Sequence, residues 1–396
     1  MRRNMIVASW AISAVLWSLA VTPAFAATPT RHVATTGVDS GGCAAQSAPC
    51  RTITYALTQA AAGDTILVGA GEYSEQVRVD LDGITIEGAG PSVTTVVGTP
   101  CAGNYTFAVF GSDVTLRGLA IGGCPEGVVA ITGHTIVEGD LFLETTDVGM
   151  SLAGGTATVL DNVFRGRNGV ADRAPGSSVV LGNTFLTHDY GIGVNLADAT
   201  VHHNRITNRP DIGVNLAATG NADLNDDWWG CNEGPNGPGC ATLIPNATAV
   251  DGWLRLEPIG APTTVGPGDT VKLAFGLVGS KSRVVATDFP AAPVAFSATA
   301  GSIDADIATI IDGVATTTFT APDEAGVYTV TARLDGGTAS ATFNRPVVPP
   351  QPTAPPTSIG ASVGERDHGG SVLLAAIGFL FITAWLIRLA VGRQRV

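Results

Sequence analysis

Three six-residue stretches in the middle of the chain share one pattern: VLDNVF at 159–164, VLGNTF at 180–185 and VHHNRI at 201–206. In each stretch an apolar residue stands three positions before an asparagine, and an apolar or aromatic residue stands two positions after it. Weaker copies occur at 116–121 and 137–142. A recurrence of 21 or 22 residues marks a repeat architecture in which each copy is one structural unit. The asparagine position runs through Leu119, Asp140, Asn162, Asn183, Asn204 and Asn225.

A second column of branched apolar residues keeps nearly the same spacing, mostly with a glycine directly before its members. The repeats are rich in Val, Ile, Thr, Asn and Gly and have no helical stripe, so each unit consists of strands and turns. They also lack the Leu-x-x-Leu-x-Leu pattern of leucine-rich repeats. Coils of three short strands would stack about 4.8 Å apart and place like residues over like. The second column consists of Val128, Val148, Val170, Ile192 and Ile212.

An asparagine in such a stack suits a sharp bend, because its side chain tolerates left-handed backbone and can hydrogen-bond to the coils above and below. The sequence therefore predicts an all-β fold that begins with a parallel β-helix over residues 27–252. We expect its structural asparagine ladder to comprise Asn162, Asn183, Asn204 and Asn225.

Both ends of the repeat region carry further motifs. The first end has GVDS, PCRTI, AAAGDTI, GEY and ITIEGAG between residues 37 and 90, and the other end has DWWGC at 227–231 followed by Gly234-Pro235. With these motifs, residues 32–90 resemble the opening of bacterial right-handed parallel β-helix proteins of the pectate-lyase-like superfamily. The resemblance covers about residues 30–250 and implies a capping helix at 53–62. It identifies an architecture and not a reaction.

Residues 253–345 have a different pattern, in which short strand-like runs are separated by Gly, Pro and Asp turns. Regular short strands over this length predict a β-sandwich. Residues 323–330 look like a tyrosine corner, and the segment 296–332 resembles bacterial Ig-like domains of the invasin type. The absence of a cysteine pair here excludes a close relation to antibody domains. The prediction is an Ig-like β-sandwich.

The two ends of the chain carry membrane signals. Residues 1–26 combine a basic start, an apolar stretch and an A-x-A site, which predicts a secretory signal peptide. A proline-rich stalk is predicted at 346–369, a transmembrane helix at 370–391 and a cytoplasmic tail at 392–396. Basic residues follow the span, so we expect a single-pass plasma-membrane protein with its N-terminal ectodomain outside the cell.

The six cysteines fall into three local pairs. In an exported chain an even number of cysteines favours disulfides, and no pair has the C-x-x-C spacing of a zinc site. The predicted bonds join Cys43 to Cys50, Cys101 to Cys124 and Cys231 to Cys240, and no metal site is predicted. The net charge of −13 makes nucleic acid an unsuitable partner, since such a surface repels phosphate.

One polar column is a candidate site. Arg167, Asp189 and Arg209 each stand three residues before a member of the second column, and His188 and Tyr190 flank the aspartate. An aspartate between two arginines could bind an acidic sugar or help to abstract a proton, but an ion-pair ladder between coils is the favoured interpretation. Asp80 and Asp82 could share one strand face and bind calcium, although two acids alone are a weak signal.

Three functions follow from these observations, and the third, a purely structural surface-layer component, would be favoured if the β-helix had no groove. The favoured one is non-catalytic. The β-helix would be a rigid surface that binds a polysaccharide or another cell-envelope component, or that is displayed towards it. The alternative is a polysaccharide lyase or glycoside hydrolase of the pectate-lyase-like superfamily. Members of that superfamily with polygalacturonase activity carry Asn-Thr-Asp, Gly-His-Gly and Arg-Ile-Lys motifs, and this sequence has none of them.

Overall fold

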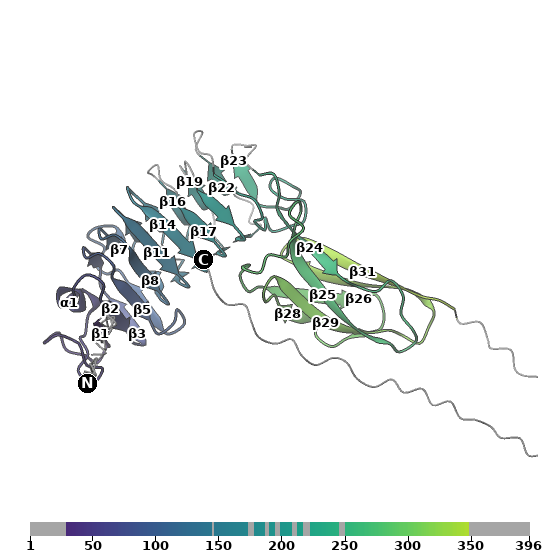
Figure 1. Cartoon of the computed structure of the whole chain (residues 1–396), viewed down its shortest axis with the longest axis horizontal. Helices are drawn as coiled ribbons and strands as arrows, with labels where there is room; N and C mark the ends of the chain where they lie inside the picture. The colour runs from purple at the N-terminus through teal and green to yellow at the C-terminus, as the bar shows by residue number, and fades with distance from the viewer. Residues whose placement is uncertain are drawn as a thin grey trace, which may run out of the picture. The chain divides into compact units, whose positions relative to one another are not determined.

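The repeats fold into coils of three short strands, and each strand pairs in parallel with its counterpart one coil away. Figure 1 shows the coils stacked in sequence order from β1 and β2 to β22 and β23. The chain is thus all-β with a parallel β-helix, as predicted. The computed structural model describes residues 29–144, 146–172, 178–186, 190–194, 199–207, 212–216, 222–244 and 250–347.

Three sheets run along the β-helix within the described residues. The first contains β1 (Thr30–Val33), β2 (Thr65–Val68), β5 (Thr85–Gly88), β8 (Val114–Arg117), β11 (His134–Glu138), β14 (Thr156–Leu160), β17 (Val179–Leu181) and β20 (Thr200–His202). The second contains β3 (Gly71–Ser74), β6 (Thr94–Val97), β9 (Ala120–Gly122), β12 (Leu141–Phe142), β15 (Val163–Phe164), β18 (Thr184–Phe185) and β21 (Arg205–Ile206). The third contains β4 (Val77–Val79), β7 (Tyr105–Val109), β10 (Glu126–Ala130), β13 (Val148–Leu152), β16 (Asn168–Asp172), β19 (Tyr190–Val194), β22 (Ile212–Leu216) and β23 (Thr242–Ile244).

The second column of the sequence lies on the third sheet, but two of its members are corrected. Pairing aligns Val128 with Met150 and Ile192 with Val214, so Met150 and Val214 occupy the places predicted for Val148 and Ile212. The corrected column has a glycine before every member. Four of these five glycines make room for a stack of aromatic rings: a Cβ on Gly149, for example, would lie 2.5 Å from the ring of Phe164. The glycines are Gly127, Gly149, Gly169, Gly191 and Gly213.

The asparagine ladder is a chain of buried hydrogen bonds. The backbone N–H of Asn162 donates to Oδ1 of Asn183 at 2.9 Å, and that of Asn183 donates to Oδ1 of Asn204 at 2.9 Å. Each side-chain amide also donates to a strand carbonyl, as Asn183 Nδ2 does to Val159 O at 2.8 Å. The ladder therefore satisfies backbone groups at a bend that water does not reach.

Asn225 is not part of this ladder, which corrects the prediction for that residue. Asp227 takes the position, because its Oδ1 accepts from both the backbone and the side-chain nitrogen of Asn204. The last coil contains two more residues than a 21-residue period allows, and Asn225 instead accepts from the backbone of Asp251 and Gly252. It shapes the exit from the β-helix.

Replacing Asn183 by alanine is expected to lower the free energy of unfolding by about 1–3 kcal/mol, because buried donors and acceptors lose their partners. Urea unfolding followed by tryptophan fluorescence measures this loss. Asn344→Ala is the matched control, since its side chain is exposed on a strand surface and should change the free energy by less than about 0.5 kcal/mol. Equal stability of Asn183→Ala and the wild type would refute the structural role of the ladder.

The start of the β-helix is closed by a short helix and a disulfide. Helix α1 (Ile53–Thr58) is shorter than the predicted segment 53–62, and it buries Ile53, Ala56 and Leu57. Its N-cap is Thr52, whose hydroxyl accepts from the backbone N–H of Tyr55. All three predicted disulfides are present: Cys43–Cys50, Cys101–Cys124 and Cys231–Cys240.

Residues 254–345 form two four-stranded sheets that share one hydrophobic core. The first sheet contains β24 (Leu254–Ile259), β25 (Thr270–Gly279), β29 (Val314–Thr320) and β27 (Ser302–Ile303), and the second contains β28 (Ile307–Thr309), β26 (Pro293–Ala298), β30 (Gly326–Leu334) and β31 (Gly337–Arg345). The hydroxyl of Tyr328 donates to the carbonyl of Glu324 at 2.6 Å, within the segment that looks like a tyrosine corner.

The predicted signal peptide, transmembrane helix and cytoplasmic tail lie outside the described residues, as does the predicted stalk beyond residue 347. Among the residues that are described, no helix has the length and apolar character needed to cross a bilayer.

Candidate functional site

The residue directly before each ladder position adopts left-handed backbone. Glycine occupies this place in some coils, as at Gly139 and Gly182, where φ is +65° and +67°. Asp161, His203 and Asp226 occupy it in others, with φ of +54°, +56° and +56°. A residue with a side chain is strained in this conformation, and such strain is concentrated at functional sites. The three non-glycine residues are therefore candidates for function.

Asp161 lines a cleft of about 760 Å3 beside the bend of the coils. The opposite wall comes from the loops at 287–291 and 310–312. This volume is in the range of small-molecule sites, which are largely apolar with a few polar groups. Here the polar groups include Asp161, Thr184, Asp288 and Asp312, and no Lys or Arg is among the lining residues that the structure describes. The apolar lining consists of Leu160, Val163, Leu181, Phe289, Pro290, Ala291, Ile310 and Ile311.

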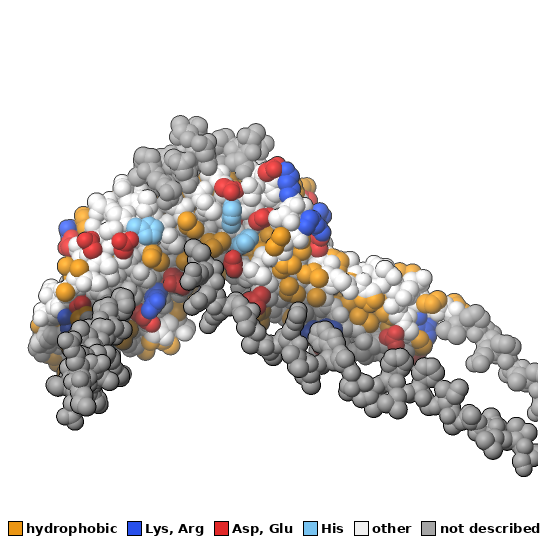
Figure 2. Space-filling model, in the orientation of Figure 1, with side chains coloured by type: hydrophobic (Ala, Val, Ile, Leu, Met, Phe, Trp, Pro, Cys, Tyr) orange, Lys and Arg blue, Asp and Glu red, His pale blue; other side chains and the backbone are white. Residues whose placement is uncertain are grey.

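Burial and nearby charges shift the pKa of Asp161, which lines the cleft, and of His203, which lies outside the lining near Asp288. Burial, together with the neighbouring carboxylates of Glu138 and Asp288, raises the pKa of the Asp161 carboxyl. Burial lowers the pKa of His203, while the Asp288 carboxylate opposes that shift. His203 Nδ1 lies 3.7 Å from Asp288 Oδ2, which is longer than a hydrogen bond. On the face drawn in Figure 2, acidic and histidine side chains lie among hydrophobic ones.

This arrangement can bind a hydroxylated ligand. Ionised carboxylates accept hydrogen bonds from hydroxyl groups, and apolar side chains cover the C–H faces of a sugar ring. A carboxyl group that keeps its proton, beside one that has lost it, can also act as a general acid.

The residues predicted as a site are only partly described. Arg167 is exposed directly before β16, and Tyr190 is the first residue of β19, where it pairs with Asn168. His188, Asp189 and Arg209 lie outside the described residues. The predicted column of Arg167, Asp189 and Arg209 therefore stays a prediction.

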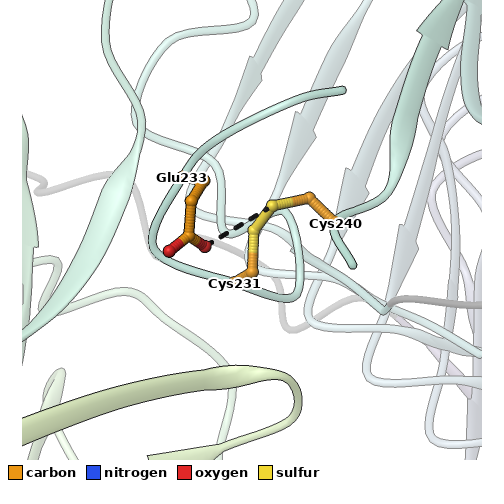
Figure 3. Close-up of side chains that lie close together, drawn as sticks. All are labelled: Cys231, Glu233 and Cys240. Carbon is orange, nitrogen blue, oxygen red and sulfur yellow. Dashed lines mark hydrogen bonds between the residues drawn. A yellow bond between two sulfur atoms is a disulfide. The ribbon is translucent and has the colours of Figure 1, made fainter. Parts of the chain in front are cut away.

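Two acidic groups that could attract a metal have other roles. Asp80 forms a two-oxygen ion pair with Arg78, and Asp82 Oδ1 accepts from the backbone of Ser112 at 2.8 Å. Within the described residues, the group of potential metal ligands is Cys231, Glu233 and Cys240. Figure 3 shows that the two cysteines are joined by a disulfide beside Glu233. A disulfide has no thiolate to offer a metal, so this cluster is structural.

The sequence contains a signal for Asp161 and His203 that the periodicity of its apolar and asparagine columns does not reveal. Both stand directly before the ladder asparagine, at a place where Gly139 and Gly182 mark left-handed backbone. A non-glycine residue in a glycine column is a recognisable exception. Asp288 had no comparable signal, because only folding brings it to Asp161 and His203 from a distant part of the chain.

Comparison with solved structures finds pectin methylesterases. One, in complex with hexasaccharide VII, is 14% identical, with 50% of this chain and 62% of that chain covered and a TM-score of 0.29. Another, PemA from Erwinia chrysanthemi, is 14% identical, with 61% of this chain and 73% of that chain covered and a TM-score of 0.29. The chain spans less than two thirds of the first of these.

No curated protein matches the sequence. A family model described as "Protein of unknown function (DUF1565)" matches residues 35–237, which is just over half of the chain and includes most of the β-helix. The chain therefore belongs to the DUF1565 family.

Proposed function

We propose that this chain is an exported, membrane-anchored surface protein of the pectate-lyase-like superfamily that binds a glycan without cleaving it. Its coil would have the right-handed sense of that superfamily, and residues 253–345 would form an Ig-like module. This module and the proline-rich segment 346–369 would hold the β-helix away from the plasma membrane, with the ectodomain outside the cell.

The observation that carries the proposal is the cleft beside Asp161. It combines a ligand-sized volume with an apolar lining and a few carboxylates. The carboxylates of Asp161, Asp288 and Asp312 would repel an acidic polysaccharide and accept hydrogen bonds from a neutral one. The ligand class that fits is therefore a neutral glycan or another uncharged envelope sugar.

A glycoside hydrolase is the second candidate, and one observation favours it. The pKa of Asp161 is raised by burial and by its acidic neighbours, so this carboxyl retains a proton more readily than a free aspartate. Hydrolases use such an acid opposite a second carboxylate. Asp288 would then be that second group.

Binding and cleavage can be separated in one experiment with the purified full-length chain in detergent. Insoluble neutral polysaccharides and polygalacturonate are each incubated with the protein, and retention and newly formed reducing ends are both measured. We expect retention on a neutral polysaccharide, no retention on polygalacturonate and no cleavage. Leu181→Asp should reduce retention by at least about tenfold, because it places a charge on the apolar wall of the cleft.

Asp147→Asn is the matched control, since this acidic residue is exposed in the segment between β12 and β13. Its retention should equal that of the wild type. New reducing ends that disappear in Asp161→Asn would establish the hydrolase instead. Retention unchanged by Leu181→Asp would show that this cleft is not the binding site.

A further inference from the structure

The ladder of buried amides ends in a carboxyl group on each side. Asp140 precedes Asn162 and Asp227 follows Asn204, and the two aspartates are 1% and 0% exposed. Their Oδ1 atoms behave like those of the asparagines: Asp140 Oδ1 accepts from the backbone of Leu119 at 2.7 Å. Asp227 Oδ1 accepts from the backbone of Asn204 at 2.8 Å. One oxygen of each carboxyl is thus fully explained by the ladder.

The other oxygen occupies the position where an asparagine carries its NH2 group. In each asparagine, Nδ2 donates at 2.8 Å to a backbone carbonyl of the preceding coil. That carbonyl belongs to the residue three positions before the ladder residue of the same coil. The three acceptors are Val137, Val159 and Val180. Extending the same register, we infer that Leu116 O faces Asp140 and that Val201 O faces Asp227. A carboxylate oxygen cannot donate to a carbonyl, and both Oδ2 atoms are buried without a hydrogen-bond partner.

We propose that Asp140 and Asp227 are neutral carboxylic acids in the folded protein. The proton on each acid would make the hydrogen bond that the side-chain NH2 group makes in the asparagines of the ladder. The O–H of Asp140 then donates to the carbonyl of Leu116, and that of Asp227 donates to the carbonyl of Val201. A carboxyl group without its proton would leave two oxygens facing each other away from water, which is costly.

The charges near both groups favour the same state. Around Asp140 the stacked coils carry Glu138 and Asp161, with Arg117 one coil below Glu138 and engaged by Glu87. Burial is the main cause that raises the pKa of Asp140 far above its usual value, and Glu138 adds to it.

Around Asp227 the neighbouring groups are Asp223, Asp226, His202 and His203, while Arg205 one coil below is held by Asp335. Burial raises the pKa of Asp227 well above its usual value, and the carboxylates of Asp226 and Asp223 act in the same direction. No cation is left over among these described neighbours to compensate an ionised Asp227.

The β-helix therefore contains a pH-sensitive pair of end rungs. In the unfolded chain both carboxyls lose their protons near the ordinary aspartate pKa, whereas in the folded chain they keep them to much higher pH. The folded state binds more protons in that interval, so stability falls as pH rises from about 4 towards the folded pKa values. The β-helix would therefore be more stable in mildly acidic surroundings than in neutral or alkaline ones.

The test replaces each acid by the amide that it imitates. Melting temperatures of the full-length chain in detergent are measured by tryptophan fluorescence from about pH 5 to about pH 8. Asp140→Asn and Asp227→Asn should each raise Tm by at least about 3 °C near pH 8, with a gain that shrinks towards pH 5. The amide needs no proton from solution, which is why its advantage grows with pH.

Replacing an interior asparagine of the ladder by aspartate tests the same idea away from Asp140 and Asp227. Asn183→Asp places a carboxyl on an interior rung, and its Tm should fall below that of the wild type by a margin that increases with pH. Asp147→Asn, an exposed acid, should show no pH-dependent difference. The proposal is overturned if both end variants differ from the wild type by the same amount at all pH values, or if Asn183→Asp does.

Discussion

Replacing Phe164 by alanine is expected to lower the free energy of unfolding by about 3–5 kcal/mol. The ring is fully buried and is stacked between those of Phe142 and Phe185, with centroids 4.5 Å and 5.0 Å away. The backbone of Gly149 packs so closely that a Cβ there would lie 2.5 Å from Phe164. Strand pairing above and below fixes that backbone, so the cavity cannot collapse. Equilibrium urea unfolding measures the loss.

Phe164→Leu is the matched control, because it keeps an apolar side chain in the stack and should cost less than about 2 kcal/mol. Gly149→Ala approaches the same contact from the opposite side and should also destabilise, since the ring must move to admit a methyl group. If Phe164→Ala cost less than about 1 kcal/mol, the stack would not be a main source of stability in the β-helix.

Replacing Asp335 by asparagine is expected to cost about 2–3 kcal/mol. Asp335 lies between β30 and β31, where its Oδ2 accepts from Arg205 Nε at 3.0 Å and from Trp228 Nε1 at 2.9 Å. Its Oδ1 accepts from Arg205 Nη2 at 2.5 Å. The side chains of Arg205 and Asp335 are each 14% exposed. Water therefore compensates little for the ion pair that Arg205 loses.

Asparagine is the appropriate replacement because Asp335 has a φ of +49°, a conformation that asparagine tolerates and alanine does not. A double-mutant cycle with Arg205→Met isolates the pair, and we expect a coupling of at least about 1 kcal/mol. Trp228 fluorescence should report the same transition, because its indole shares the carboxylate. A coupling near zero would show that the two residues contribute independently.

The parallel β-helix was predictable because its repeat places like residues over like. The Asn162, Asn183 and Asn204 spacing defined the coil, and the hydrogen bonds between coils follow that spacing. The second column was shifted by two residues at Val148 and at Ile212. A shift of two leaves a side chain on the same face of a strand, so periodicity alone cannot detect it. Strand pairing aligns Met150 and Val214 with the column, so that a glycine precedes every member and four of these glycines face the aromatic stack.

What the sequence determined by itself was local and repetitive: the coil, the ladder and the disulfides, because each depends on neighbours at a fixed separation. The end of the ladder and the cleft were decided only by the tertiary structure, because they depend on segments that meet after folding. Asp227 replaces Asn225 because the last coil contains two residues more than the 21-residue period before this position is reached. The cleft exists because residues 287–291 reach Asp161, and no period in the sequence relates the two. Long-range packing fixes such contacts through shape and burial, and neither leaves a regular pattern along the chain.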